Sequence, residues 1–181
     1  MRHPLLLIMA MLMSLVATAQ TNRIFIEDFE IEPGATDSVP VLLSNVDPSR
    51  GLQFNISLPE GLNYMGAEVS EYASGYKMSV SCNYNQKNSC YSAFIYPPGP
   101  ICFPADTTAV VMYIWLMAKD DFKGGPIITW KCRGSALDNN TIIMDGDTTV
   151  VTVPQASLIG IPVENRQAQD QYFNLTGQSA N

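Results

Sequence analysis

The longest apolar stretch of the chain covers ten consecutive residues, 109–118. It is rich in β-branched and aromatic side chains, and both of its alternating faces are apolar, which predicts a central strand buried on both faces. A membrane-spanning helix needs about 20 apolar residues, so this run is too short to be one. A charged segment ending in two glycines, 119–125, separates it from a second apolar run at 126–132. This order predicts that the two runs pair through a Gly-Gly loop.

Shorter segments with a period of two precede this run. The clearest lies at residues 52–58, where four apolar residues alternate with the polar Gln53, Asn55 and Ser57. A similar alternation starts at residue 24 and changes phase near Asp28, which predicts a β-bulge. Turns rich in Pro and Gly separate the segments, and no helical period is sustained between residues 20 and 154. These features predict an all-β, antiparallel β-sandwich in a single domain.

The N-terminal residues have the three parts of a secretory signal peptide. A short basic start, with Arg2 and His3, is followed by an apolar core at residues 5–16 and by the small-residue site Ala-Thr-Ala before Gln20. This layout predicts that residues 1–19 are cleaved and that the protein is exported. An N-terminal membrane anchor is the alternative, but the apolar core is short and no basic stop follows it. We therefore expect no membrane span in the mature protein.

Charge and composition argue against several classes of function. The chain has a net charge of −7 and no basic cluster, so it is a poor candidate for binding nucleic acid or anionic membranes. Its single histidine, His3, lies in the predicted signal peptide, so a catalytic triad that needs histidine is not available to the mature chain. The acidic loops around Asp138 and Asp145 do not match a calcium-binding EF-hand loop. We expect no enzyme activity, no cofactor and no metal.

Several motifs resemble a known family when they are taken in order. FEIEPG at residues 29–34, SVPVLLSNV at 38–46 and GLQFNISLPEGL at 51–62 are followed by the long apolar strand and by a closing run at 148–153. The order and spacing resemble a cohesin-like module of the kind found in secreted proteins of Bacteroidetes. The resemblance implies a non-catalytic jelly-roll β-sandwich of about nine strands, close in architecture to carbohydrate-binding modules. We place this domain at residues 20–153. Cohesins present one sheet face to a pair of dockerin helices.

Four cysteines in an exported chain suggest two disulfides, for which three connectivities exist. We expect Cys82–Cys90 to close the tip of a hairpin around a polar loop. The second pair, Cys102–Cys132, would then tie a loop to the strand that follows the Gly-Gly turn.

Tyrosine is concentrated in the middle third of the chain, where six of the eight tyrosines lie between Tyr64 and Tyr96. Amphipathic tyrosines can stack on sugars or anchor a protein partner. They can also complete the core from strand edges, and that alternative stays open. The candidate binding residues are Tyr72, Tyr76, Tyr84, Tyr91 and Tyr96.

The sequence changes character after residue 153. The remaining residues, 154–181, are polar and without pattern for much of their length, so we expect a partly disordered tail. The expected function is that of an exported, non-catalytic binding module that mediates protein–protein assembly at the cell envelope or outside the cell. Its partner would be a dockerin-like protein or another envelope component. Two alternatives are a carbohydrate-binding module for polysaccharide and a structural subunit of an adhesin or fimbrial layer.

Overall fold

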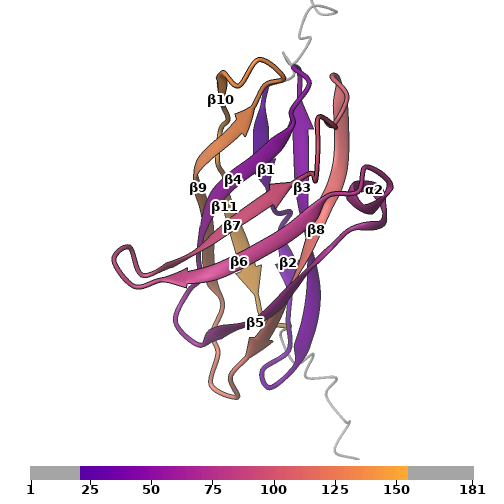
Figure 1. The fold of residues 1–181 in the computed structure, drawn as a ribbon. Helices are drawn as coiled ribbons and strands as arrows, with labels where there is room; N and C mark the ends of the chain where they lie inside the picture. The colour runs from indigo at the N-terminus through magenta and orange to yellow at the C-terminus, as the bar shows by residue number, and fades with distance from the viewer. Residues whose placement is uncertain (1–20, 155–181) are drawn as a thin grey trace, which may run out of the picture.

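The computed structural model describes residues 21–154, most of which form two β-sheets packed face to face (Figure 1). The smaller sheet has the strand order β1 (Arg23–Phe25), β3 (Thr36–Asn45), β8 (Thr107–Ala118) and β5 (Leu62–Val69). The larger sheet has the order β2 (Phe29–Glu30), β11 (Thr148–Thr152), β9 (Gly125–Ser135), β4 (Gly51–Ser57), β7 (Cys90–Tyr96) and β6 (Ser79–Asn85), with β10 (Thr141–Ile143) beside β9. The predicted all-β sandwich is confirmed. It has 11 strands in the described residues rather than about nine. The predicted signal peptide and the predicted tail, apart from Pro154, lie outside the described residues.

The phase change near Asp28 marks a change of sheet and not the predicted β-bulge. Before it, β1 pairs antiparallel with β3 in the smaller sheet, and after it β2 pairs parallel with β11 in the larger sheet. Asp28 lies at the crossing, where its carboxylate accepts a 2.7 Å hydrogen bond from the backbone N–H of Val150. One alternating segment therefore becomes two short strands, which accounts for part of the higher strand number.

The long apolar run forms β8, and its predicted place inside a sheet is confirmed because β8 pairs with β3 and with β5. The prediction that both of its faces are buried is wrong. Ile114 and Leu116 point into the core and are fully buried, whereas Trp115 between them is 39% exposed. Tyr113 and Met117, which alternate with the core residues as Trp115 does, are half-buried, so the apolar side chains of this outer face remain in part accessible.

The predicted pairing of the two apolar runs is also wrong. β8 belongs to the smaller sheet and β9 to the larger one, so the loop between them crosses from one sheet to the other. Gly124 in this loop has φ 87°, and its Cα approaches the backbone of Val151 so closely that a Cβ would lie 2.7 Å from the Val151 carbonyl oxygen. The glycine is needed because the loop turns tightly against β11.

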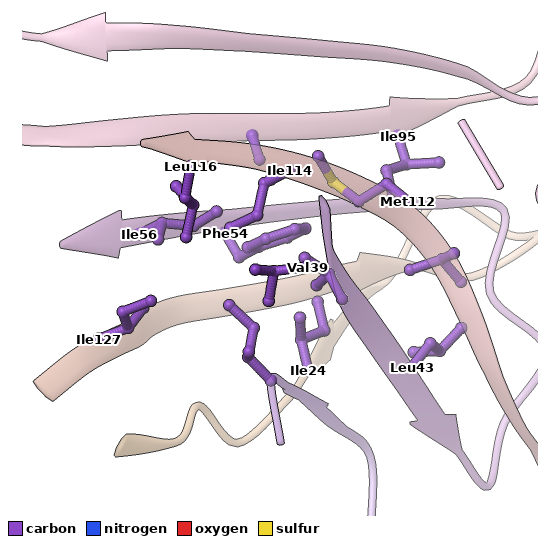
Figure 2. Packing of buried hydrophobic residues seen from close by; sticks show 14 of the residues in the cluster. Ile24, Val39, Leu43, Phe54, Ile56, Ile95, Met112, Ile114, Leu116 and Ile127 are labelled. Carbon is purple, nitrogen blue, oxygen red and sulfur yellow. The ribbon is translucent and has the colours of Figure 1, made fainter. Parts of the chain in front are cut away.

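The core lies between the two sheets and is built from their alternating inward residues. The period-two pattern of residues 52–58 is confirmed in part: Phe54 and Ile56 of β4 are buried and Gln53 is exposed, but the polar Asn55 is buried as well. Figure 2 shows these two side chains beside Ile114 and Leu116, which come from β8 in the other sheet. Burying an aliphatic or aromatic side chain of this size contributes about 1.5–3 kcal/mol, so this inter-sheet layer supplies much of the stability.

One short helix is present in the described residues, α2 (Glu71–Gly75), between β5 and β6. Ser70 is its N-cap: the Oγ accepts a 3.1 Å hydrogen bond from the Ala73 N–H and donates a 2.6 Å bond to the carbonyl of Val110 on β8. The cap thus fixes the helix and attaches it to the smaller sheet. Between residues 21 and 154 no helix has the length and apolar character needed to cross a membrane.

Neither expected disulfide is present, and all four cysteines are free thiols in the structure. The register explains why Cys82 and Cys90 do not meet: Cys82 is opposite Ala93, and Cys90 is opposite Asn85, nearer the tip of the hairpin. The pair is offset by three residues along two antiparallel strands, which is too far for a disulfide. Cys102 and Cys132 are likewise unbonded, and Cys132 packs in the hydrophobic core.

Candidate functional site

The outward side chains of β6, β7, β4 and β9 form the candidate site, which we call the open face. These four strands are neighbours in the larger sheet, and the β6–β7 hairpin extends beyond the rest of the sandwich (Figure 1). Their register aligns the outward residues in rows across the sheet. Two of the rows are Ser81, Phe94, Gln53, Arg133 and Asn83, Ser92, Asn55, Trp130.

One end of the open face is hollow and carries exposed aromatic side chains. A hollow of about 600 Å³ is lined by residues of all four strands. Phe94 is 38% exposed and Tyr96 is 50% exposed at its wall. Gly51 lies opposite Ser135 and next to Tyr96, and its missing side chain leaves room between them. The hollow therefore combines partly exposed aromatic surface with hydroxyl and amide groups such as those of Ser81 and Gln53.

Hydrogen bonds hold the polar side chains in place at the middle of the open face. Ser92 Oγ donates to Asn55 Oδ1 at 3.0 Å, and the indole N–H of Trp130 donates to Ser57 Oγ at 3.0 Å. The Lys131 Nζ lies 4.8 Å from the centre of the Trp130 ring, within range of a cation–π interaction. Trp130 is only partly exposed, so it acts first as a packing residue. The surface is ordered without a bound partner, which lowers the entropic cost of binding.

Lys131 reaches the open face through a β-bulge. The register between β4 and β9 shifts between Gln53 and Asn55, so two residues of β9, Lys131 and Cys132, lie opposite a single position of β4. Lys131 has φ 52°, in the left-handed region, and its side chain is exposed while Cys132 is buried. The bulge thus adds a cation to the open face next to Trp130.

Two of the five predicted tyrosines, Tyr72 and Tyr76, pack inside the fold. Both rings lie against Phe103, each with a centroid distance of 5.8 Å, and they contact each other at 5.2 Å. Phe103 is fully buried. Burial raises the pKa of the Tyr72 hydroxyl above its ordinary value. These two tyrosines close the sandwich beside α2 and are not on the open face.

Tyr91 and Tyr84 lie on the inward side of the β6–β7 hairpin. The Tyr91 ring contacts Tyr64 of β5 at a tilt, with a centroid distance of 4.5 Å, and Tyr84 edge-on at 5.2 Å. Burial, with the neighbouring Cys82 thiol, raises the pKa of Tyr64. Tyr84 is 56% exposed, but it points away from the open face. Of the predicted tyrosines, the structure places Tyr96 alone on the open face.

Sequence reasoning missed Phe94, Trp130 as a surface residue, and Arg133. Phe94 could have been found from the alternation of β7, in which Ser92, Phe94 and Tyr96 share one face. Arg133 could not, because its position beside Gln53 depends on a register shifted by the bulge at Lys131. Within residues 21–154, no cluster of three or more His, Cys, Asp or Glu side chains is arranged to hold a metal ion.

Comparison with solved structures identifies the fold. A cohesin in a type I cohesin–dockerin complex from Clostridium thermocellum is 19% identical with a TM-score of 0.61, covering 74% of this chain and 99% of that chain. The sixth cohesin of scaffoldin B from Acetivibrio cellulolyticus, in complex with a Cel5 dockerin, is 13% identical with a TM-score of 0.58 (74% and 99% covered). A non-cellulosomal cohesin from the archaeon Archaeoglobus fulgidus is 12% identical with a TM-score of 0.55 (73% and 91% covered).

No family model matches the sequence, and no curated protein matches it either. At these low identities the structural likeness establishes the fold alone. The described residues therefore adopt the jelly-roll β-sandwich of cohesin domains.

Proposed function

We propose that this chain is a non-catalytic, cohesin-like module that binds a protein partner through its open face. The fold supports the proposal, because structures with the same fold were solved as complexes with dockerins. The observation that carries it is the composition of the open face. Two exposed aromatic residues, Phe94 and Tyr96, border a hollow and are surrounded by Gln53, Ser81 and Asn83. Exposed aromatic anchors next to polar groups are typical of protein interfaces.

Polysaccharide binding has less support. Phe94 and Tyr96 share one face, as a sugar-binding platform requires, but the similar structures with a bound partner are complexes with dockerins and not with sugars. Assembly into an adhesin or fimbrial layer would instead use an open strand edge. β6 is such an edge among the described strands, and we treat edge pairing as an outcome of the tests.

Export is part of the same proposal. A binding module that acts at the envelope or outside the cell must leave the cytoplasm, and residues 1–19 have the composition of a cleavable signal peptide. N-terminal sequencing of the protein recovered from the envelope or the culture medium should begin at Gln20. Recovery from the cytoplasm with an intact N-terminus would contradict export.

Affinity capture with paired variants tests the binding proposal. The full chain is immobilised and exposed to envelope extracts of the organism that encodes it, and retained proteins are identified by mass spectrometry. The test variant, Phe94→Ser/Tyr96→Ser, removes two exposed apolar side chains from the open face. The control, Met65→Ser/Trp115→Ser, removes two from the outer face of the smaller sheet, where Met65 is 57% exposed.

We expect a discrete protein to be retained by the wild type and by the control, and retention to fall about tenfold or more in the test variant. Equal retention by the wild type and the test variant would contradict binding through the open face. Retention on a polysaccharide gel, lost in the same variant, would favour the carbohydrate alternative. Higher oligomers on sizing that persist in both variants would favour assembly.

A further inference from the structure

Charge is distributed unevenly between the open face and the rest of the molecule. The chain has 17 acidic and 10 basic residues, yet the four strands of the open face contain no Asp or Glu. Their charged residues are Lys131 and Arg133, both on β9 and both exposed. After β9, the first carboxylate is that of Asp138, which accepts hydrogen bonds from Asn140. The open face is thus a cationic area on an acidic protein.

Neither cation forms an ion pair within the part of the chain that the structure describes. Across residues 21–154 the one ion pair joins Arg23 to Asp147, at 2.8 Å, and neither residue belongs to the open face. The Lys131 ammonium contacts the Trp130 ring, which leaves its charge uncompensated by an anion. Arg133 lies in the same row as Gln53 and Phe94 and lines the hollow.

A partner that covers the open face will remove water from both cations. The loss of hydration is costly unless the partner supplies negative charge, because a cation buried without an anion destabilises a complex. Arg133 can accept a carboxylate through two parallel N–H···O bonds, and Lys131 can bind a second one as a point charge. The aromatic groups Phe94 and Tyr96 would supply the apolar part of the same interface.

We propose that the surface which binds the open face is an acidic protein surface, with carboxylates placed against Lys131 and Arg133. This inference rests on the proposed function and specifies the partner. A basic contact surface would leave like charges facing each other. Nucleic acid is a weaker candidate, because binding it commonly uses about 6–10 phosphate contacts and the open face offers two cations.

Replacing the two cationic residues tests this inference better than varying the salt concentration does. The net charge of −7 repels an acidic partner at long range, while the two cations attract it at contact. Screening acts over about 8 Å at physiological ionic strength, so salt reduces the repulsion as well as the attraction. A pair of variants with equal net charge removes this ambiguity, since the two proteins differ only in where the charge is lost.

The test variant is Lys131→Asn/Arg133→Gln, in which Asn suits the left-handed backbone at residue 131. The control is Lys119→Asn/Lys123→Gln, which removes two exposed cations from the β8–β9 loop. Both variants are immobilised as full chains beside the wild type and exposed to envelope extract in two portions, one treated with nuclease and one untreated. In parallel, a carbodiimide couples amines directly to carboxylates in contact, and mass spectrometry locates the linked peptides.

Some proteins will be retained by the wild type. We expect the retained amount of these proteins to fall about tenfold with the test variant and to stay unchanged with the control. We also expect a link between Lys131 and an Asp or Glu of a retained protein.

Equal or stronger retention by the test variant, without that link, would overturn the acidic partner while leaving protein binding intact. Loss of retention on nuclease treatment would overturn it in favour of nucleic acid. Absence of any protein retained by the wild type would overturn both proposals. The single variant Arg133→Gln repeats the comparison without changing the bulge, should the double variant melt at lower temperature.

Discussion

The buried thiol of Cys132 gives the folded state a pH dependence of its own. Burial raises the pKa of this thiol to about 12 from its ordinary value of 9.0, and the nearby Asp145 carboxylate adds to the rise. Burial also raises the pKa of the Cys82 and Cys90 thiols. These residues behave as small hydrophobic side chains with inert thiols, which contrasts with the disulfides expected from the sequence.

We predict that the stability of the fold decreases as the pH rises from about 9 towards 12. In the unfolded chain the Cys132 thiol ionises near its ordinary pKa, whereas the folded protein keeps it protonated, so unfolding releases a proton in this range. Denaturant unfolding at several pH values measures the effect. The fall in the free energy of unfolding across this pH range should be smaller in Cys132→Ala than in the wild type. An equal fall in the two proteins would contradict the assignment.

At the scale of elements, the sequence predicted the individual strands better than the way in which they pair. The alternation in β4 and the interior position of β8 were predicted correctly because both depend on local pattern. The sheet change at Asp28 and the separation of β8 from β9 were not predicted correctly. A phase slip or a Gly-Gly loop has the same local sequence pattern whether the chain stays in one sheet or crosses to the other. Pairing is decided by contacts that are distant in sequence.

The loop between β10 and β11 provides a test at the same scale. It is joined to β9 by two backbone hydrogen bonds between Thr129 and Asp147, of 2.8 and 3.2 Å. Gly146 lies so close to this strand that a Cβ would collide with the Thr129 carbonyl oxygen. We predict that Gly146→Ala destabilises the protein by about 1–3 kcal/mol, as forced overpacking does. Denaturant unfolding measures this value.

Gly99→Ala is the control for this substitution, because a Cβ at Gly99 meets no atom within 4 Å. It should change the stability by less than about 0.5 kcal/mol. Similar effects of the two substitutions would contradict the close packing of the loop against β9.

For the whole molecule, the sandwich presents two outer faces with different character. The open face is polar, carries aromatic residues at a hollow and contains two cations. The outer face of the smaller sheet is apolar around Trp115 and Met65. The predicted fold class is confirmed, and Tyr96 is the one of the five candidate tyrosines on the open face. The binding role of the middle third stays a prediction. The face as a unit could not be predicted, because its four strands come from residues 51–57, 79–96 and 125–135 and meet only through register.

Site-specific photo-crosslinking tests the central claim most directly, namely that a protein partner binds the open face. A photoreactive benzoyl-phenylalanine replaces Phe94 in one protein and Met65 in another, and both are irradiated in the same envelope extract. We predict a discrete cross-linked protein from the Phe94 position and none from the Met65 position. A product formed from Met65 and not from Phe94 would place the partner on the other sheet and contradict the account.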